Sequence, residues 1–139
     1  ANDFMFRKTI KDNGSTATNF LDEMFNDCKD NQQMTSMINL AKDTLNYVIN
    51  NRDDYEKLSC ISFDYMMGFG YLIGGWLMHK AKIKANLKLS SENQNEIFLK
   101  SKIISGNFYN LHILPRIQSH FQIVINGAEV IQSANDSYI

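Results

Sequence analysis

Residues 68–78, GFGYLIGGWLM, are the most distinctive stretch of this 139-residue sequence. Its four glycines, at positions 68, 70, 74 and 75, are separated by aromatic and aliphatic residues. A membrane-spanning helix needs about 20 apolar residues, and Asp64 on one side and His79 and Lys80 on the other leave the run too short. A phosphate loop requires the spacing GxGxxG or GxxxxGK[ST], which this run does not have. We therefore favour a buried helix whose glycines let a neighbouring backbone come close.

The spacing of these glycines predicts how the helix packs. Gly70 and Gly74 are four residues apart and lie on one helix face. Each glycine costs about 1 kcal/mol relative to alanine in a helix, so close packing has to offset the loss. We expect Gly70 or Gly74 to be buried at a crossing with residues 121–128, with Gly127 facing it. The residues to which we assign structural packing are Gly70, Gly74, Gly75, Trp76, Phe108 and Pro115.

Length and composition favour one helical domain. The apolar content of 44% is ordinary for a globular protein, and one proline with seven glycines argues against a β fold with many turns. The net charge of −1 does not point to nucleic acid or to an anionic membrane as a partner.

Cys28 and Cys60 lack metal-binding spacing, so we expect free thiols in a reducing compartment, the cytoplasm. The chain begins without methionine, which suggests either processing or a fragment.

The apolar periodicity predicts an all-α, antiparallel, up-and-down bundle of three long helices, at 18–51, 54–88 and 91–132, because the connections are short and polar. The polar patch at 27–33 is either an exposed face of one helix, which we favour, or a turn between two helices. Pro115 either kinks the third helix or splits it, giving four helices. We expect residues 1–16 to be a connector that docks by its aromatic residues, 17–133 the bundle domain, and 134–139 a frayed tail.

Apolar residues at three-to-four spacing mark the expected core face of each helix. The expected core residues are Leu21, Met24, Cys28, Met34, Ile38, Ala41, Leu45 and Val48 in the first helix; Ile61, Tyr65, Phe69, Leu72, Trp76 and Ile83 in the second; and Ile97, Ile104, Phe108 and Leu111 in the third, continuing in phase as Ile117, Phe121, Val124, Ala128 and Ile131. Asp53 with Glu56, and Ser91 with Gln94, have capping-box spacing at the starts of the second and third helices.

The residue pattern predicts no catalytic, cofactor-binding or metal site. His112 and His120 are eight residues apart and can share a helix face, but no carboxylate or cysteine stands at ligand spacing from any of the three histidines. No nucleophile motif is present. The lysines near the end of the second helix complement the helix dipole, with a site for an anionic group as the alternative. These lysines are Lys80, Lys82, Lys84 and Lys88.

Three segments resemble a known family. They are FGYLIGGWLMHKA at 69–81, FLKSKIISGNFYNLHILP at 98–115 and INGAEVI at 125–131. They are similar to the C-terminal helical domain appended to one branch of acyl-CoA dehydrogenases, a branch that includes the methylmercaptopropionyl-CoA dehydrogenase-like enzymes. The matching positions are Gly70, Gly74, Gly75, Trp76, Lys102, Phe108, Tyr109, Leu114 and Pro115. Residues 4–24 also resemble the connector that leads from the flavin-binding domains of that family.

The resemblance implies a parent flavoenzyme whose chemistry lies in other domains. Such enzymes oxidise an acyl-CoA to a 2,3-enoyl-CoA: a carboxylate removes the α proton and FAD accepts the β hydride. Because the family holds both groups upstream, the resemblance assigns this chain no catalytic residue and no FAD contact. It implies the upstream dehydrogenase domains as partners, a homo-oligomeric parent, and a role in assembly or in enclosing the active site. The alternative is a free-standing helical interaction module; a reading frame continuing upstream of Ala1 into a flavoenzyme core would decide between them.

Overall fold

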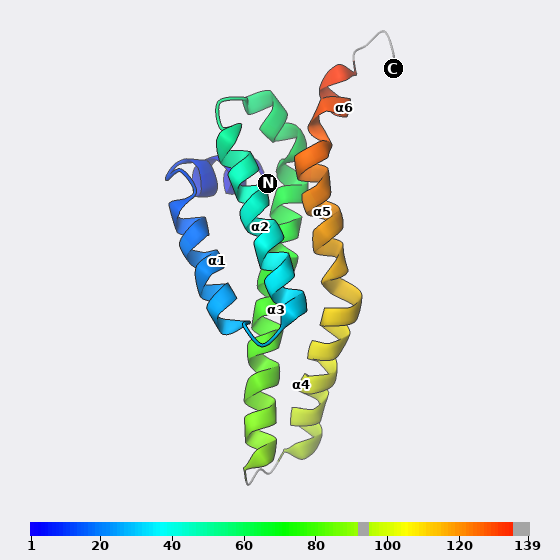
Figure 1. Ribbon diagram of the computed structural model, residues 1–139. Coiled ribbons are helices and arrows are strands. Elements are labelled where there is room, and N and C mark those ends of the chain that lie inside the picture. The colour runs from blue at the N-terminus through cyan, green and yellow to red at the C-terminus, as the bar shows by residue number, and fades with distance from the viewer. Residues whose placement is uncertain (92–94, 135–139) are drawn as a thin grey trace.

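The computed structural model describes residues 1–91 and 95–134, and the regular elements in these ranges are all helical. Consecutive long elements alternate in direction and form an up-and-down bundle (Figure 1). The all-α prediction is therefore confirmed for the described residues. The elements are the π-helical segment η1 (Asp3–Ile10), α1 (Ser15–Asp27), α2 (Gln32–Asn50), α3 (Tyr55–Ser90), α4 (Glu96–Phe108), the π-helical segment η2 (Tyr109–Ile113), α5 (Pro115–Asn126) and α6 (Ala128–Ser133).

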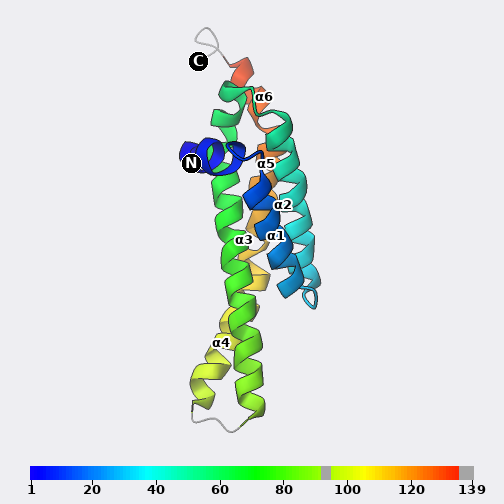
Figure 2. The same cartoon turned by 90° about the vertical axis from the view of Figure 1, so that its left-hand side faces the viewer.

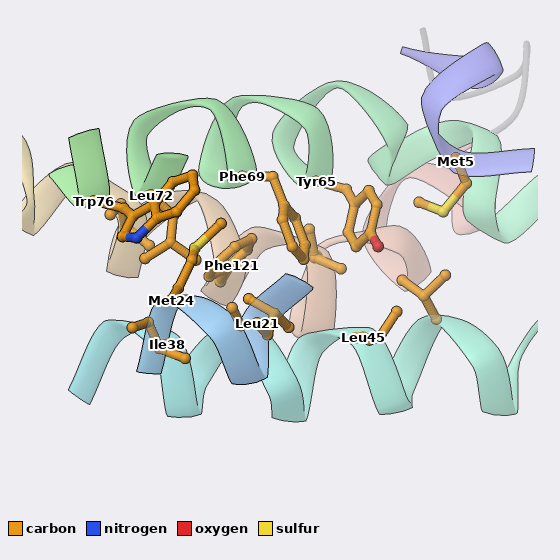
Figure 3. Close-up of a cluster of buried hydrophobic side chains, with 14 of the residues drawn as sticks. Met5, Leu21, Met24, Ile38, Leu45, Tyr65, Phe69, Leu72, Trp76 and Phe121 are labelled. Carbon is orange, nitrogen blue, oxygen red and sulfur yellow. The ribbon is translucent and has the colours of Figure 1, made fainter. Parts of the chain in front are cut away.

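The first predicted helix is in fact two helices, so the prediction of one helix over 18–51 is wrong. Backbone geometry leaves the α region at Cys28, where α1 ends. Asn31 then caps α2, because its side-chain oxygen accepts a hydrogen bond from the amide of Met34 at 3.1 Å. The polar patch 27–33 is thus the turn of a helical hairpin, and Figure 3 shows Met24 of α1 beside Ile38 of α2.

Helix α3 is the central element and runs unbroken from Tyr55 to Ser90. Asp54, and not the predicted Asp53, caps it by accepting a hydrogen bond from the amide of Lys57 at 3.0 Å. The predicted core row is buried from Ile61 to Trp76, and only Ile83 is partly exposed. The predicted start of the next helix at Ser91 is also wrong: Ser91 follows α3 directly, α4 begins at Glu96, and Gln94 lies outside the described residues.

Residues 1–16 hold helical segment η1, which crosses α3 (Figure 2). The Phe4 ring lies 5.3 Å from that of Tyr65, and Phe6 stacks on Tyr55 at 4.5 Å. The Tyr65 hydroxyl donates a hydrogen bond to Thr9 at 3.2 Å, and burial raises the pKa of Tyr65. The aromatic residues of η1 therefore attach the N-terminal segment to the first half of α3.

Pro115 does not end the helical geometry at Leu114, whose φ of −53° and ψ of −38° are α-helical. The chain instead widens into η2, where the Leu114 amide bonds to the Tyr109 carbonyl, five residues earlier. In the same five-residue pattern, the carbonyl of Asn110 would accept a hydrogen bond from the nitrogen of Pro115, but that nitrogen carries no hydrogen. Gln33 compensates by donating to the Asn110 carbonyl at 2.7 Å, so α2 stabilises the π turn.

The glycines of α3 pack, but not in the predicted way. A Cβ at position 68 would overlap the Phe121 ring, and one at position 74 would overlap the Tyr109 hydroxyl. A Cβ at position 75 would lie 2.7 Å from Leu114 and 2.9 Å from the Met34 sulfur. Glycine at these three positions therefore lets α5, η2 and α2 approach α3 closely.

Gly70 and Gly127 do not have the predicted partners. Gly70 is exposed, and a Cβ there would meet no atom of the described residues within 4 Å, so its assignment to packing among them is wrong. A Cβ at Gly127 would meet the carbonyl of Ile123 on its own preceding turn rather than any residue of α3. The crossing of α3 with α5 instead uses Gly68, which follows Ile61 by seven residues and so belongs to the core row.

Candidate interaction surface

The predicted core row of α4 and η2 faces outward. Ile97 is 88% exposed, Ile104 67%, Phe108 55% and Leu111 70%. Their prediction as core residues is wrong, and so is the assignment of Phe108 to packing within the chain. We call these four residues the outer face. A row of large apolar side chains on an exposed helix face is typical of interaction surfaces.

Two features of the structure explain why the outer face is uncovered. Phe108 and Ile117 are nine residues apart, and the π-helical η2 lies between them, so the apolar row of α4 does not continue in phase into the buried row of α5. In addition, α4 and the end of α3 extend beyond α1 and α2, which leaves α4 with α3 as its main neighbour (Figures 1 and 2). We call this projecting pair, α4 with the end of α3, the arm. Two helices that contact only each other can bury only one side of each helix.

The inner side of α4 carries Leu99, the partly buried Ile103 and Gly106. Leu99 is buried, and Gly106 packs its backbone against Lys82, with a Cβ at position 106 only 3.3 Å from Lys82 Cβ. Neither Leu99 nor Gly106 is in the predicted core row, although the two are seven residues apart and so lie on one face of α4. Ile97, Ile104 and Phe108 of α4 remain on the solvent side.

Tyr109 joins the arm to the bundle. Its ring covers Gly74, and its hydroxyl donates a hydrogen bond to the carbonyl of Tyr71 at 2.7 Å. Burial, with a smaller contribution from Tyr71, raises the pKa of Tyr109. The hydroxyl is therefore held as a neutral donor at the position where α3 has no side chain.

The three histidines have separate partners. His79 is buried, with Nε2 2.9 Å from an Asp30 carboxylate oxygen. Nδ1 of His120 lies 2.7 Å from Asp64, whereas His112 stacks on Phe108 at 4.5 Å. The described residues contain no group of three or more histidine, cysteine, aspartate or glutamate side chains that could hold a metal ion.

The polar groups at the end of α3 are partly engaged within the chain. Lys80 lies over the Trp76 ring at 4.7 Å, and Lys82 packs on Gly106. The Trp76 indole nitrogen donates to Asp27 at 2.9 Å. These contacts favour a structural role for Lys80 and Lys82 over the alternative of an anion site.

The thiols are not arranged for catalysis. Cys28 is buried in the core, and this burial, with smaller contributions from Asp27 and Asp30, raises the pKa of its thiol to about 11. A thiol held protonated at neutral pH is a poor nucleophile. Cys28 and Cys60 are both free.

An apolar cavity of about 280 Å³ lies between η1, α1 and α3. Phe4, Phe20, Phe69 and Ile73 form its walls, and Lys8, Thr9, Thr16 and Ala17 complete the lining. Its volume is at the lower end of the range found for small-molecule sites. Separately, no helix among the described residues has both the length and the apolar character to cross a membrane.

The sequence of the chain matches a known protein family. Residues 7–134 match the family described as "Acetyl-CoA dehydrogenase C-terminal like". The chain belongs to this family. The match covers all of the bundle and the outer face, and it supports the resemblance to the C-terminal domain of acyl-CoA dehydrogenases. A search of curated proteins found no significant match.

Membership in this C-terminal-like family raises the question of whether FAD fits the chain itself. The glycine run lies in the interior of α3, where amide hydrogens bond to carbonyls within the helix and are not available to a phosphate. The polar groove beside His79, about 300 Å³, has its one buried polar side chain already bonded to Asp30 and Asn31. The described residues therefore do not fit the flavin, and no chemical step is assigned to them.

Proposed function

We propose that this chain is the C-terminal accessory domain of an acyl-CoA dehydrogenase-like flavoenzyme and that it docks on the dehydrogenase domains through the outer face. The observation that carries the proposal is the exposure of Ile97, Ile104, Phe108 and Leu111 on an arm with no covering helix among the described elements. The family match supports the choice of partner, because the family's description names the C-terminal part of a dehydrogenase.

The proposed parent enzyme oxidises an acyl-CoA to a 2,3-enoyl-CoA with FAD, in the branch that contains methylmercaptopropionyl-CoA dehydrogenase-like enzymes, and works in the cytoplasm. The chain itself contributes assembly or enclosure of the active site and no catalytic group. Burial of four large apolar side chains is enough to matter, since each fully buried side chain of this kind contributes about 1.5–3 kcal/mol.

The proposal is tested by the affinity of the purified chain for the dehydrogenase domains of the same source, produced as a separate polypeptide. Ile104→Asp places a charge at the centre of the outer face and is expected to weaken binding by about 2 kcal/mol or more, as at an interface hot spot. Titration calorimetry measures the loss. Because Ile104 is exposed in the free chain, the Ile104→Asp variant should have the same melting temperature as the parent chain.

Asn39→Asp is the matched control, because it adds the same charge at an exposed position of α2 that is not part of the outer face. It should bind like the parent chain. Equal affinity of Ile104→Asp and Asn39→Asp would contradict docking through the outer face. A large fall in the melting temperature of Ile104→Asp would show instead that Ile104 packs within the chain.

A further inference from the structure

A second uncharged surface lies on α3, away from the outer face. Phe63 is 57% exposed and Leu77 54%, and Gly70 lies midway between them with open space above its backbone. The three residues are spaced by seven, or about two turns, and therefore form one line along the helix. No charged residue occurs between Asp64 and Lys80, and Asp64 itself is paired with His120.

The two ends of this row of residues on α3 carry opposite charges. Glu56 lies seven residues before Phe63, and Lys84 lies seven residues after Leu77. Both are exposed, and neither forms an ion pair with another residue that the structure describes. We call Glu56, Phe63, Gly70, Leu77 and Lys84 the α3 line.

The α3 line can pair with the α3 line of a second copy that runs in the opposite direction. A two-fold interface requires that if one residue contacts a second, the second also contacts the first across the axis. With the axis at Gly70, Phe63 meets Leu77 of the other copy, and Glu56 meets Lys84 of the other copy. A parallel arrangement instead places Glu56 on Glu56 and Lys84 on Lys84, and such like-charge contacts are unfavourable.

We propose that a second copy of this chain packs its α3 antiparallel on the α3 line, with the two backbones closest at Gly70. Gly70 costs α3 helix stability, and a Cβ there would meet none of the described atoms within 4 Å. The dimer explains the glycine, because a side chain there would hold the two helices apart. This self-association does not require the outer face, which is on α4 and η2.

Sedimentation velocity of the 139-residue chain over a range of concentrations tests the proposal. The parent chain is expected to form a dimer. Gly70→Gln is expected to raise the dissociation constant at least about tenfold, while helical content and melting temperature at low concentration are retained because position 70 is open. Ile104→Asp is the control, because it alters the outer face and should leave the dimer intact.

Charge exchange tests the antiparallel register. Glu56→Lys alone and Lys84→Glu alone should each weaken the dimer, and the double variant should recover it, since both symmetric ion pairs are restored with reversed polarity. A parent chain that stays monomeric at concentrations on the order of 100 μM, a dimer insensitive to Gly70→Gln, or a double variant that does not recover would each overturn the proposal. Loss of the dimer in Ile104→Asp alone would place self-association on the outer face instead.

Discussion

Gly68→Leu is expected to lower the free energy of unfolding by about 3 kcal/mol, which corresponds to a fall in melting temperature of roughly 10 °C for a domain of this size. A Cβ at position 68 alone already overlaps the Phe121 ring, and Cδ1 of that ring lies 2.7 Å from it. Phe121 cannot move away easily, because it is fully buried and packs edge-on against Phe69 at 5.4 Å (Figure 3). Thermal unfolding followed by circular dichroism measures the change.

Gly70→Ala is the matched control for this prediction. It lies two residues away on the same helix, but its side chain enters open space. We expect it to stabilise the chain by about 0.5–1 kcal/mol in dilute solution, since alanine is the better helix former. If Gly68→Leu and Gly70→Ala melt at the same temperature, glycine does not determine the packing of α3 on α5.

Trp76→Ala is expected to cost about 3–5 kcal/mol, the usual range for removing a large aromatic side chain from a core. Trp76 is 9% exposed, contacts Phe20 edge-on at 5.3 Å, and bonds to Asp27 at 2.9 Å. It thereby attaches α1 to the middle of α3. Urea unfolding gives the free-energy difference between the variant and the parent.

Trp76→Phe separates the two contributions of this side chain. It retains an aromatic ring beside Phe20 and loses the hydrogen bond to Asp27, so we expect a smaller cost of about 1 kcal/mol. The account of Trp76 as a packing residue fails if Trp76→Ala is no more destabilising than Trp76→Phe.

The core of α3 could be predicted from the sequence because its periodicity is set within one helix. Ile61, Tyr65, Phe69, Leu72 and Trp76 follow one face and are buried. The partners of the glycines could not be predicted in the same way, because they depend on how three other elements cross α3. The membership of Gly68 in the core row was nevertheless visible from its spacing to Ile61 and Tyr65.

The orientation of α4 was predicted wrongly for a different reason. Size predicts Ile97, Ile104 and Phe108 as the core row, although the buried residues of α4 are Leu99 and Gly106. Size favoured the wrong face, because the exposed Ile97, Ile104 and Phe108 are larger than Gly106, which packs on α3. The π turn before Pro115 could not be anticipated, since its free carbonyl is satisfied by Gln33 from a distant part of the sequence.

The accessibility of the outer face in the free and joined states tests the central claim most directly. Hydroxyl-radical footprinting with mass spectrometry measures the oxidation of Phe108 and Leu111 in the chain alone and in the chain bound or fused to the dehydrogenase domains. Docking predicts strong oxidation in the free chain, where both side chains are more than half exposed, and protection in the joined protein. Equal oxidation of Phe108 and Leu111 in the two states would contradict it.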